Sequence, residues 1–365
     1  MIKYTPTIGL EIHIELKTKQ KMFCDCLNDP EEKKSNLNIC PICLAHPGVL
    51  PKSNQEAMEK VLQLGLALNC HLAKIAKFDR KNYFYPDLPK GYQISQYDKP
   101  FCQNGYLEIS DIEEELYRFK KISIRRIHLE EDTARLIHEG SSSFVDFNRA
   151  GIPLAELVTE PEIHSAKEAR RFCEELHLII KYLDIGDADM EKGEMRCEVN
   201  ISIAADEPNG ASKVLGTKVE VKNLNSFRAV EEAIEYEIKR QTELLEKGEK
   251  IIQETRGWNE KEKKTISQRI KEEAQDYRYF PEPDLKPIKT AEAFDLDELQ
   301  RAIPELPNDK RLRFLKEYGL KAKEVEELIY NPPIADYFEK VIMELDGLKK
   351  IEGREREERI KLAYN

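Results

Sequence analysis

The sequence has no apolar run long enough to cross a membrane. A transmembrane helix needs roughly 18 consecutive apolar residues, and no stretch of these 365 residues approaches that length. The N-terminal segment MIKYTPTIGLEIHIEL also lacks the hydrophobic core and the cleavage site of a secretory signal peptide. We therefore expect a cytoplasmic protein that has no membrane partner.

Several common motifs are also missing. The sequence contains no G-x-x-x-x-G-K-[ST], no G-x-G-x-x-G and no H-E-x-x-H, so any nucleotide site would be neither a P-loop nor a Rossmann site. We find no nucleophile constellation of the amidase type, no internal repeat and no low-complexity segment. The net charge of −11 argues against a protein that binds nucleic acid over its whole surface, although it allows a local basic patch.

Four of the eight cysteines form two close pairs. Cys24 and Cys26 are followed, after a short loop, by Cys40 and Cys43, and such paired thiols are typical of a tetrahedral zinc site. An iron–sulfur cluster, a redox pair or free thiols are the alternatives. A closed site with four sulfurs leaves no position for a substrate, so we predict structural zinc at residues 24–43. The remaining cysteines are scattered and are predicted to be core residues.

The pattern of apolar residues predicts an α+β fold with two domains. Alternation with period two predicts strands of an antiparallel sheet that has one polar face; these segments are Thr7–Leu16, Met195–Ile203 and Lys218–Lys222. Helical spacing and capping signals predict helices between them, at Asn54–Asn69, from Ser165 to near Gly186, and at Ser226–Lys247. After Pro287 the sequence shows only helical segments. We predict a cradle-like catalytic domain over residues 1–290 and an all-helical domain over residues 291–365.

The first predicted strand carries a row of metal-binding side chains. Glu11, His13 and Glu15 share one face of it, because side chains two residues apart on a strand point the same way. A row of carboxylate, imidazole and carboxylate suits a hard cation, and a solvated polar face is the competing interpretation.

Two further segments supply carboxylates. In Arg126–Asp132, Glu130 shares a face with His128 if a strand extends that far, whereas Glu131 lies opposite or on a bend. Glu156 is an acidic residue within an apolar stretch. Carboxylates from three segments around a histidine are typical of a magnesium site for phosphoryl transfer.

Phosphoryl transfer also needs groups that stabilise the phosphate oxygens. The candidates are Lys81, Lys90, Arg149, Arg196, Lys222 and Arg278, together with Asn223 at a predicted strand-to-helix junction. Taken singly, each cation is more often a structural salt-bridge partner.

The segment Phe78–Tyr97 has an unusual composition. Six of its twenty residues are aromatic and three are basic, and two prolines and a glycine interrupt it. A loop of this kind suits an anion that carries a base or a sugar, although a packed structural loop is the alternative. The segment resembles the signature of the B subunit of the glutamyl/aspartyl-tRNA amidotransferase (GatB) family. The likeness runs from Ile8 to about Phe338 and is most specific at the opening segment, Asp146–Glu156, Glu220–Phe227 and Asp276–Asp284.

The resemblance implies a kinase and transamidase. In such a protein ATP phosphorylates the side-chain carboxylate of Glu-tRNA(Gln) or Asp-tRNA(Asn), and ammonia from a glutaminase (A) subunit displaces the phosphate; a small accessory (C) subunit completes the complex. The magnesium ligands would be Glu11, His13, Glu130, Glu131 and Glu156. Lys81, Lys90 and Arg196 would act in catalysis, and Arg149, Lys222, Asn223 and Arg278 would bind the nucleotide. Structural zinc would be held by the four paired cysteines.

The chain departs from the family pattern in some places. Thr133-Ala-Arg135 replaces a common Ala-Gly-Lys, and Glu198 replaces a common Asp. Family members usually continue into a helical tail domain that helps to hold tRNA, so we expect a truncated helical domain here and weaker binding of tRNA by this chain alone. The competing functions are a non-catalytic tRNA-binding or scaffold subunit of the same complex and a stand-alone metal-dependent phosphohydrolase.

Overall fold

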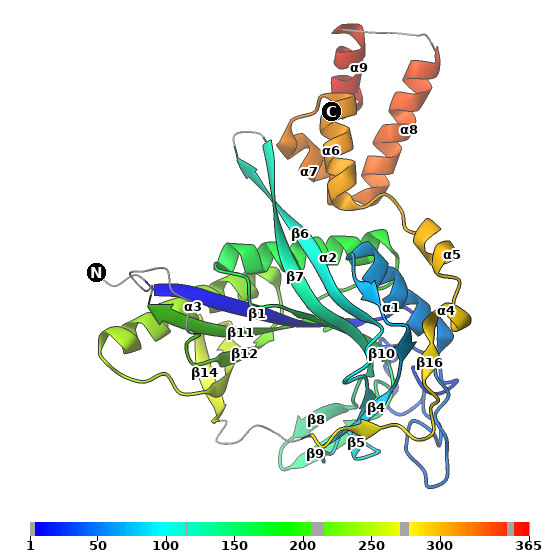
Figure 1. The fold of residues 1–365 in the computed structure, drawn as a ribbon, viewed down its shortest axis with the longest axis vertical. Coiled ribbons are helices and arrows are strands. Elements are labelled where there is room, and N and C mark those ends of the chain that lie inside the picture. Colours follow the sequence, from blue (N-terminus) through cyan, green and yellow to red (C-terminus); the bar gives the residue numbers. More distant parts are fainter. Residues whose placement is uncertain (1–3, 114–115, 206–214, 271–276, 349–353, 365) are drawn as a thin grey trace. The chain divides into compact units, whose positions relative to one another are not determined.

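The structure is a computed structural model that describes residues 4–113, 116–205, 215–270, 277–348 and 354–364 (Figure 1). None of the helices in these ranges combines the length and the apolarity of a transmembrane span. The chain divides into two compact units. The first comprises Met1–Leu107 and Ile122–Ala302, and the second comprises Glu108–Lys121 and Ile303–Asn365.

A mostly antiparallel sheet of nine strands organises the fold. Its order is β14-β13-β12-β11-β1-β10-β7-β6-β2. β1 pairs antiparallel with both β10 and β11, and β10 with β7, whereas β12 and β13 run parallel. In sheet order the strands span Lys264–Ile270, Glu254–Asn259, Val219–Leu224, Met195–Ala205, Tyr4–Glu15, Pro153–Thr159, Leu116–Glu131, Cys102–Glu113 and His71–Leu72. The predicted α+β class and the three predicted strands are therefore confirmed; the cradle shape stays a prediction.

The sheet has one apolar and one polar face, as the alternation predicts. On β1, Ile8, Ile12 and Ile14 are fully buried and Leu10 is 1% exposed. Helices α2 (Ala166–Tyr182) and α3 (Phe227–Glu246) contact each other, and α3 contacts β11; Figure 1 shows both helices on the same side of the sheet. This side forms the core, which leaves the polar face of β1 and its neighbours to build a cavity.

The predicted helix starts are confirmed. Ser165 and Ser226 cap α2 and α3, because their hydroxyls accept hydrogen bonds from the backbone N–H groups of Glu168 and Ala229. Asn54 caps α1 (Gln55–Ala67) in the same way. The Glu168 carboxylate accepts a hydrogen bond from the backbone N–H of His164.

The segment Phe78–Tyr97 contains two short strands where its composition predicts a loop. β4 (Asp79–Asn82) pairs with β5 (Tyr92–Ser95) on one side and with β15 (Phe280–Pro281) on the other. The two aromatic, proline-containing segments of the chain thus lie side by side. The remaining short elements are β3 (Ile75–Ala76), β8 (Arg135–Glu139), β9 (Ser142–Asp146), β16 (Ile288–Lys289), α4 (Thr290–Ala293) and α5 (Leu296–Arg301).

In the second unit, helices contact the described parts of residues 108–121, because Tyr117 donates to the Ala322 carbonyl and Asn308 donates to the Glu108 carbonyl. Its helices are α6 (Pro307–Tyr318), α7 (Ala322–Ile329), α8 (Pro332–Leu348) and α9 (Arg354–Tyr364). Phe314, Tyr318 and Phe338 form its aromatic core, and the fully buried Arg311 pairs with Glu326 at 2.6 Å.

The described part of residues 291–365 is helical, as predicted. The compact division, however, assigns α4 and α5 to the first unit. Phe294, at the end of α4, packs edge-on against Phe101 with 6.3 Å between ring centroids. A domain boundary near residue 290 remains a prediction.

Candidate functional site

A cavity of about 490 Å³ lies on the polar face of the sheet. Strand pairing places its side chains in a row, because His13 lies opposite Arg196 on one side and Glu156 on the other, and Glu156 lies opposite His128. Directly opposite residues on neighbouring strands have their Cβ atoms about 5 Å apart. Four strands, β11, β1, β10 and β7, therefore each contribute one side chain to the same line.

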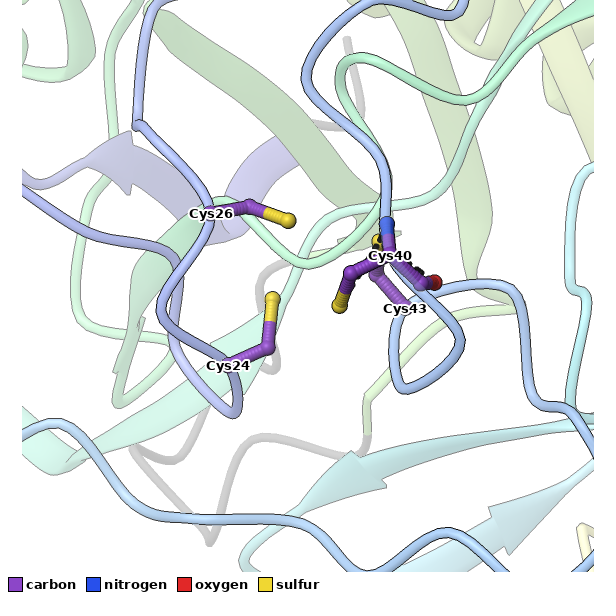
Figure 2. Close-up of side chains that lie close together, drawn as sticks. All are labelled: Cys24, Cys26, Cys40 and Cys43. Atoms are coloured by element: carbon purple, nitrogen blue, oxygen red, sulfur yellow. Dashed lines mark hydrogen bonds between the residues drawn. The ribbon is translucent and has the colours of Figure 1, made fainter.

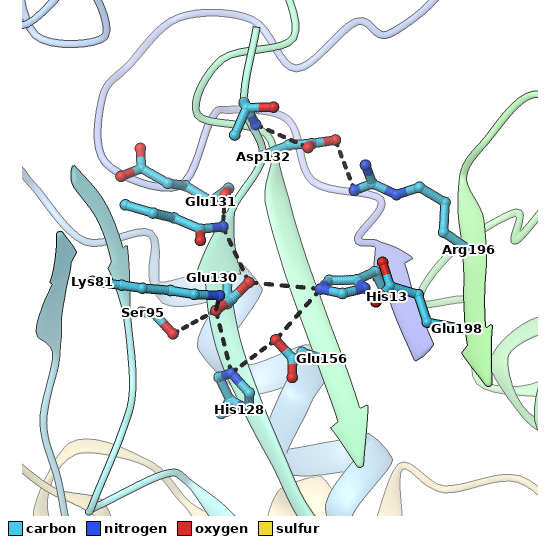
Figure 3. Close-up of polar contacts among 12 residues, drawn as sticks. His13, Lys81, Ser95, His128, Glu130, Glu131, Asp132, Glu156, Arg196 and Glu198 are labelled. Carbon is cyan, nitrogen blue, oxygen red and sulfur yellow. Dashed lines mark hydrogen bonds and ion pairs between the residues drawn. The ribbon is translucent and has the colours of Figure 1, made fainter. Parts of the chain in front are cut away.

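Two histidines and two glutamates, His13, His128, Glu130 and Glu156, converge along this row (Figure 3), and Glu11 lies close to His13 and Glu156. The Nε2 atom of His13 lies 3.4 Å from a Glu156 oxygen and 3.7 Å from a Glu130 oxygen. His128 Nε2 lies 3.3 Å and 3.4 Å from the same two carboxylates. The ligand atoms of Glu11, His13 and Glu156 lie within 4.8 Å of one another, and so do those of His128, Glu130 and Glu156. Glu156 is common to both sets.

The pKa values of the cluster divide its members into two groups: side chains held in their charged form and one carboxyl that is harder to ionise. Burial alone would lower the pKa of His13, but hydrogen bonds with Glu130 and Glu156 raise it to about 10. Burial would raise the pKa of Glu130, yet Lys81 and the two histidines hold it well below its usual range. Glu11 differs, because burial and then the charges of Glu156 and Glu198 raise its pKa to about 7. Three glutamates thus offer hard oxygen ligands within one small space, which suits a divalent cation.

Glu130 is held in place by the neighbouring small sheet. Ser95 Oγ donates a hydrogen bond of 2.6 Å to Glu130, Gln93 donates one of 3.1 Å, and Lys81 Nζ lies 3.5 Å away. Lys81 also lies over the ring of Tyr277 at 5.3 Å. The predicted catalytic residue Lys81 therefore does reach the carboxylate cluster.

Glu131 points away from this cluster (Figure 3). It follows Glu130 on β7, and successive side chains of a strand face opposite ways. Its carboxylate accepts from the Ile94 N–H at 2.9 Å and pairs with Lys90 at 2.7 Å. Both side chains line a separate cavity of about 240 Å³ beside Cys24 and Cys43. The prediction that Glu131 lies opposite Glu130 is confirmed, and the geometry does not bring Glu131 or Lys90 to the row.

The remaining predicted residues fall into two groups. Arg196 and Lys222 line the larger cavity, where Lys222 pairs with Glu198 at 2.9 Å. Arg149, Asn223 and Arg278 do not line it. Arg149 pairs with Asp132 and Glu15, and Asn223 donates to the Trp258 carbonyl at 2.9 Å.

Sequence reasoning missed several residues of the cavity. His128, Asp132, Glu198, Glu220, Gln93 and Ser95 contact the cluster or line the cavity. Glu198 and Glu220 alternate with apolar residues on β11 and β12, which are neighbouring strands. The alternation of Met195–Ile203 and Lys218–Lys222 did place both carboxylates on the polar face, but the strand pairing that brings them to the cavity was not predicted.

The four paired cysteines lie together, as their spacing predicts (Figure 2). Their sulfur atoms lie within 4.8 Å of one another, and the backbone N–H of Cys40 donates to the Cys43 sulfur at 3.1 Å. A hydrogen bond from Cys24 is the main cause that lowers the pKa of Cys43 to about 5. Four neighbouring thiols, of which Cys43 has a lowered pKa, fit a tetrahedral metal ion bound by thiolates.

Comparisons with known proteins identify the family of this chain. Residues 6–295 match the family described as the GatB/GatE catalytic domain. The B subunit of the aspartyl/glutamyl-tRNA(Asn/Gln) amidotransferase of Thermoanaerobacter pseudethanolicus is 49% identical over 351 residues, which cover 96% of this chain and 72% of that protein. The proteins of the same name from Persephonella marina and Thermotoga maritima are also 49% identical, over 93% of this chain and 70% of theirs. The chain therefore belongs to the GatB family.

Proposed function

We propose that this chain is the B subunit of a tRNA-dependent amidotransferase, a glutamine-hydrolysing ligase, and that its larger cavity phosphorylates the substrate. An oxygen of the side-chain carboxylate of Glu-tRNA(Gln) or Asp-tRNA(Asn) attacks the γ-phosphorus of ATP, and ADP leaves. Ammonia then attacks the carbon of the resulting acyl phosphate, and phosphate leaves. Membership of the family supports this function. The observation that carries it is the group of histidines and glutamates on the paired strands β1, β10 and β7, with Arg196 beside it on β11.

Glu11, His13, Glu130 and Glu156 are the residues that would hold Mg²⁺. Their carboxylate oxygens and imidazole nitrogens lie close enough to share one ion or two neighbouring ions. When bound, Mg²⁺ supplies positive charge to the phosphate oxygens. Glu130 and Glu156 have pKa values below the usual range, the former through Lys81 and the histidines and the latter through His128 first. Both are therefore ionised, as ligands must be, whereas His13 would have to lose its proton before it binds the cation.

Three cations on the cavity wall would stabilise the transferred phosphoryl group. Lys81 is kept protonated because Glu130 and Glu156 raise its pKa, against the effect of burial. Arg196 and Lys222 reach the cavity from β11 and β12. The carboxylates of the chain serve as ligands rather than as nucleophiles, since the attacking carboxylate belongs to the substrate.

The four cysteines would hold structural zinc. The set Cys24, Cys26, Cys40 and Cys43 offers four sulfur ligands, and a closed tetrahedral site of this kind contributes to folding rather than to chemistry. The proposed partners are a glutaminase (A) subunit, which supplies ammonia, and a small accessory (C) subunit.

ATP consumption tests the proposed function. The chain is assembled with its glutaminase and accessory subunits, and phosphate release is measured with and without Glu-tRNA(Gln) over a series of Mg²⁺ concentrations. We expect release that requires both charged tRNA and Mg²⁺. No release from an assembled and folded complex would favour the scaffold function, and release by the isolated chain without tRNA would favour the phosphohydrolase.

A matched pair of variants assigns the chemistry to the cavity. Glu156→Gln should reduce phosphate release to background without unfolding the chain, because it removes the carboxylate that both ligand sets share. Glu160→Gln is the control, since Glu160 lies just beyond the same strand and pairs with Arg125 outside the cavity. Retained ATP cleavage in Glu156→Gln would refute the assignment.

A further inference from the structure

Asp132 is a buried carboxylate at the edge of the larger cavity that no proposed step uses. It follows the last residue of β7 and is 5% exposed. Its backbone is fixed on both sides, because its N–H donates to the Ile152 carbonyl and its carbonyl accepts from the Gly151 N–H. One carboxylate oxygen accepts from the Thr133 N–H at 2.9 Å. The side chain therefore has a defined direction before it meets any cation.

The other oxygen of Asp132 receives two guanidinium groups. Arg149 donates through Nε at 2.6 Å, and Arg196 donates through one terminal nitrogen at 3.1 Å. Arg149 lies behind Asp132, since its second nitrogen pairs with Glu15 at 2.9 Å and it does not line the cavity. Asp132 thus holds one arginine on each side through this oxygen.

The guanidinium group of Arg196 is fixed through one terminal nitrogen, which donates to Asp132. Its side chain is 38% exposed and lines the cavity, and Asp132 is its hydrogen-bond and salt-bridge partner among the residues that the structure describes. Figure 3 shows the side chain of Arg196 extending to Asp132 from β11, the strand that pairs with β1 beside His13. A guanidinium has five N–H donors in a rigid plane, so fixing one nitrogen leaves donors that face the cavity in a set orientation.

We propose that Asp132, supported by Arg149, is a positioning residue that aims the guanidinium of Arg196 at the phosphoryl group during transfer. This inference rests on the proposed function of the cavity. An arginine side chain that is already ordered can donate to the phosphoryl group without losing further conformational entropy. A displacement of such a donor by about 1 Å can lower the rate roughly 100-fold. Asp132 acts through Arg196 and does not touch the substrate.

A double-mutant cycle tests the proposal in the assembled complex with Glu-tRNA(Gln), ATP and Mg²⁺. The four proteins are the wild type, Asp132→Asn, Arg196→Ala and the double variant. We expect Asp132→Asn to lower kcat by about 100-fold with a much smaller change in the KM for ATP. In the Arg196→Ala background the same substitution should have almost no further effect. Losses that multiply in the double variant would overturn the proposal.

Rescue of activity by added guanidinium ion is a second measurement, and it would show no effect if Asp132 had only a structural role. Millimolar guanidinium chloride should partly restore the activity of Arg196→Ala, because Asp132 can hold the free ion where the side chain lay. It should restore nothing in the double variant, and equal rescue of both would contradict the proposal. Glu160→Gln, which breaks an arginine–carboxylate pair outside the cavity, should leave activity unchanged.

These outcomes separate the inference from its premise. A wild-type complex that cleaves no ATP overturns the proposed function and this inference together. An active wild type in which the losses multiply overturns the inference alone. Melting temperatures of all four proteins identify any variant that fails to fold. If Asp132→Asn does not fold, Arg149→Ala takes its place in the cycle and in the rescue, because Arg149 supports the same oxygen of Asp132.

Discussion

Glu11 and Glu156 lie in the same cavity but ionise differently. Burial dominates at Glu11, and the charges of Glu156 and Glu198 add to it, so its pKa rises to about 7. At Glu156 burial acts in the same direction, yet His128 and further hydrogen bonds outweigh it and lower the pKa. Without a bound cation, Glu156 therefore stays ionised, and its charge helps to keep Glu11 protonated up to a pH of about 7.

We predict that Glu11→Gln stabilises the metal-free protein at pH 8. A carboxyl whose folded pKa lies above its unfolded value costs stability as the pH rises from about 4.5 to 7, because the unfolded chain loses its proton more easily. Removing the charge should therefore raise the free energy of unfolding by about 1–3 kcal/mol at pH 8 and leave it unchanged at pH 4. Urea unfolding in magnesium-free buffer, without a chelator that would strip the cysteine site, measures this difference.

Added Mg²⁺ provides the control for this prediction. The wild type should gain stability at pH 8 as Mg²⁺ binds, whereas Glu11→Gln should gain less because it has lost a ligand. Glu191→Gln, on the surface, should behave as the wild type under both conditions. A variant that is less stable than the wild type at pH 8 would show that Glu11 is not the strained carboxylate.

At the scale of elements, strand β7 separates two neighbouring glutamates. Glu130 faces the row with His13 and Glu156, whereas Glu131 faces Lys90 and the cysteine side of the molecule. We predict that Glu130→Gln lowers the affinity for Mg²⁺ by about 100-fold and that Glu131→Gln leaves it unchanged. Titration of Mg²⁺ followed by calorimetry measures both. An equal loss in the two variants would mean that β7 is twisted or shifted in register near its end.

The same strands show what the sequence could and could not predict. The alternation of Ile8, Leu10 and Ile12 with Glu11 and His13 is a local pattern, so the faces of β1 followed from the sequence. The spacing of the cysteines was likewise local and brought the four thiols together correctly. The pairing of His13 with Glu156 is a contact between distant segments. Their residue types indicated a shared metal site, but no local pattern gave the strand pairing that joins them.

The cations were harder to place because an arginine or a lysine can serve equally in a salt bridge or in a site. Arg149 and Lys90 carry the same charge as Arg196 and Lys81, and nothing in their neighbouring residues distinguishes them. Their partners, Asp132 and Glu131, are fixed by the end of β7 and by the segment that follows it. Which cation reaches the cavity thus depends on tertiary contacts.

At the scale of the whole molecule, the larger cavity belongs to one compact unit. Every residue that lines it lies within Met1–Leu107 or Ile122–Ala302. We predict that a chain ending at Ala302 still binds Mg²⁺ and a non-hydrolysable ATP analogue with the affinity of the 365-residue chain. Calorimetry on both proteins measures this. A loss of binding by a folded shorter chain would show that the cavity depends on the helices of the second unit.

The alternation along β1 places even-numbered and odd-numbered positions under different selective constraints. The core packing constrains the even-numbered positions Ile8, Leu10, Ile12 and Ile14, whereas the cavity constrains Glu11 and His13. Substitutions at odd positions can therefore be selected for a new substrate or a new ion while the core stays intact. The deletion of a single residue between Gly9 and Glu15 would be far more damaging, because it would exchange the two faces and bury the ligands where the core should be. Selection can thus revise the residues of this strand one at a time but not its length.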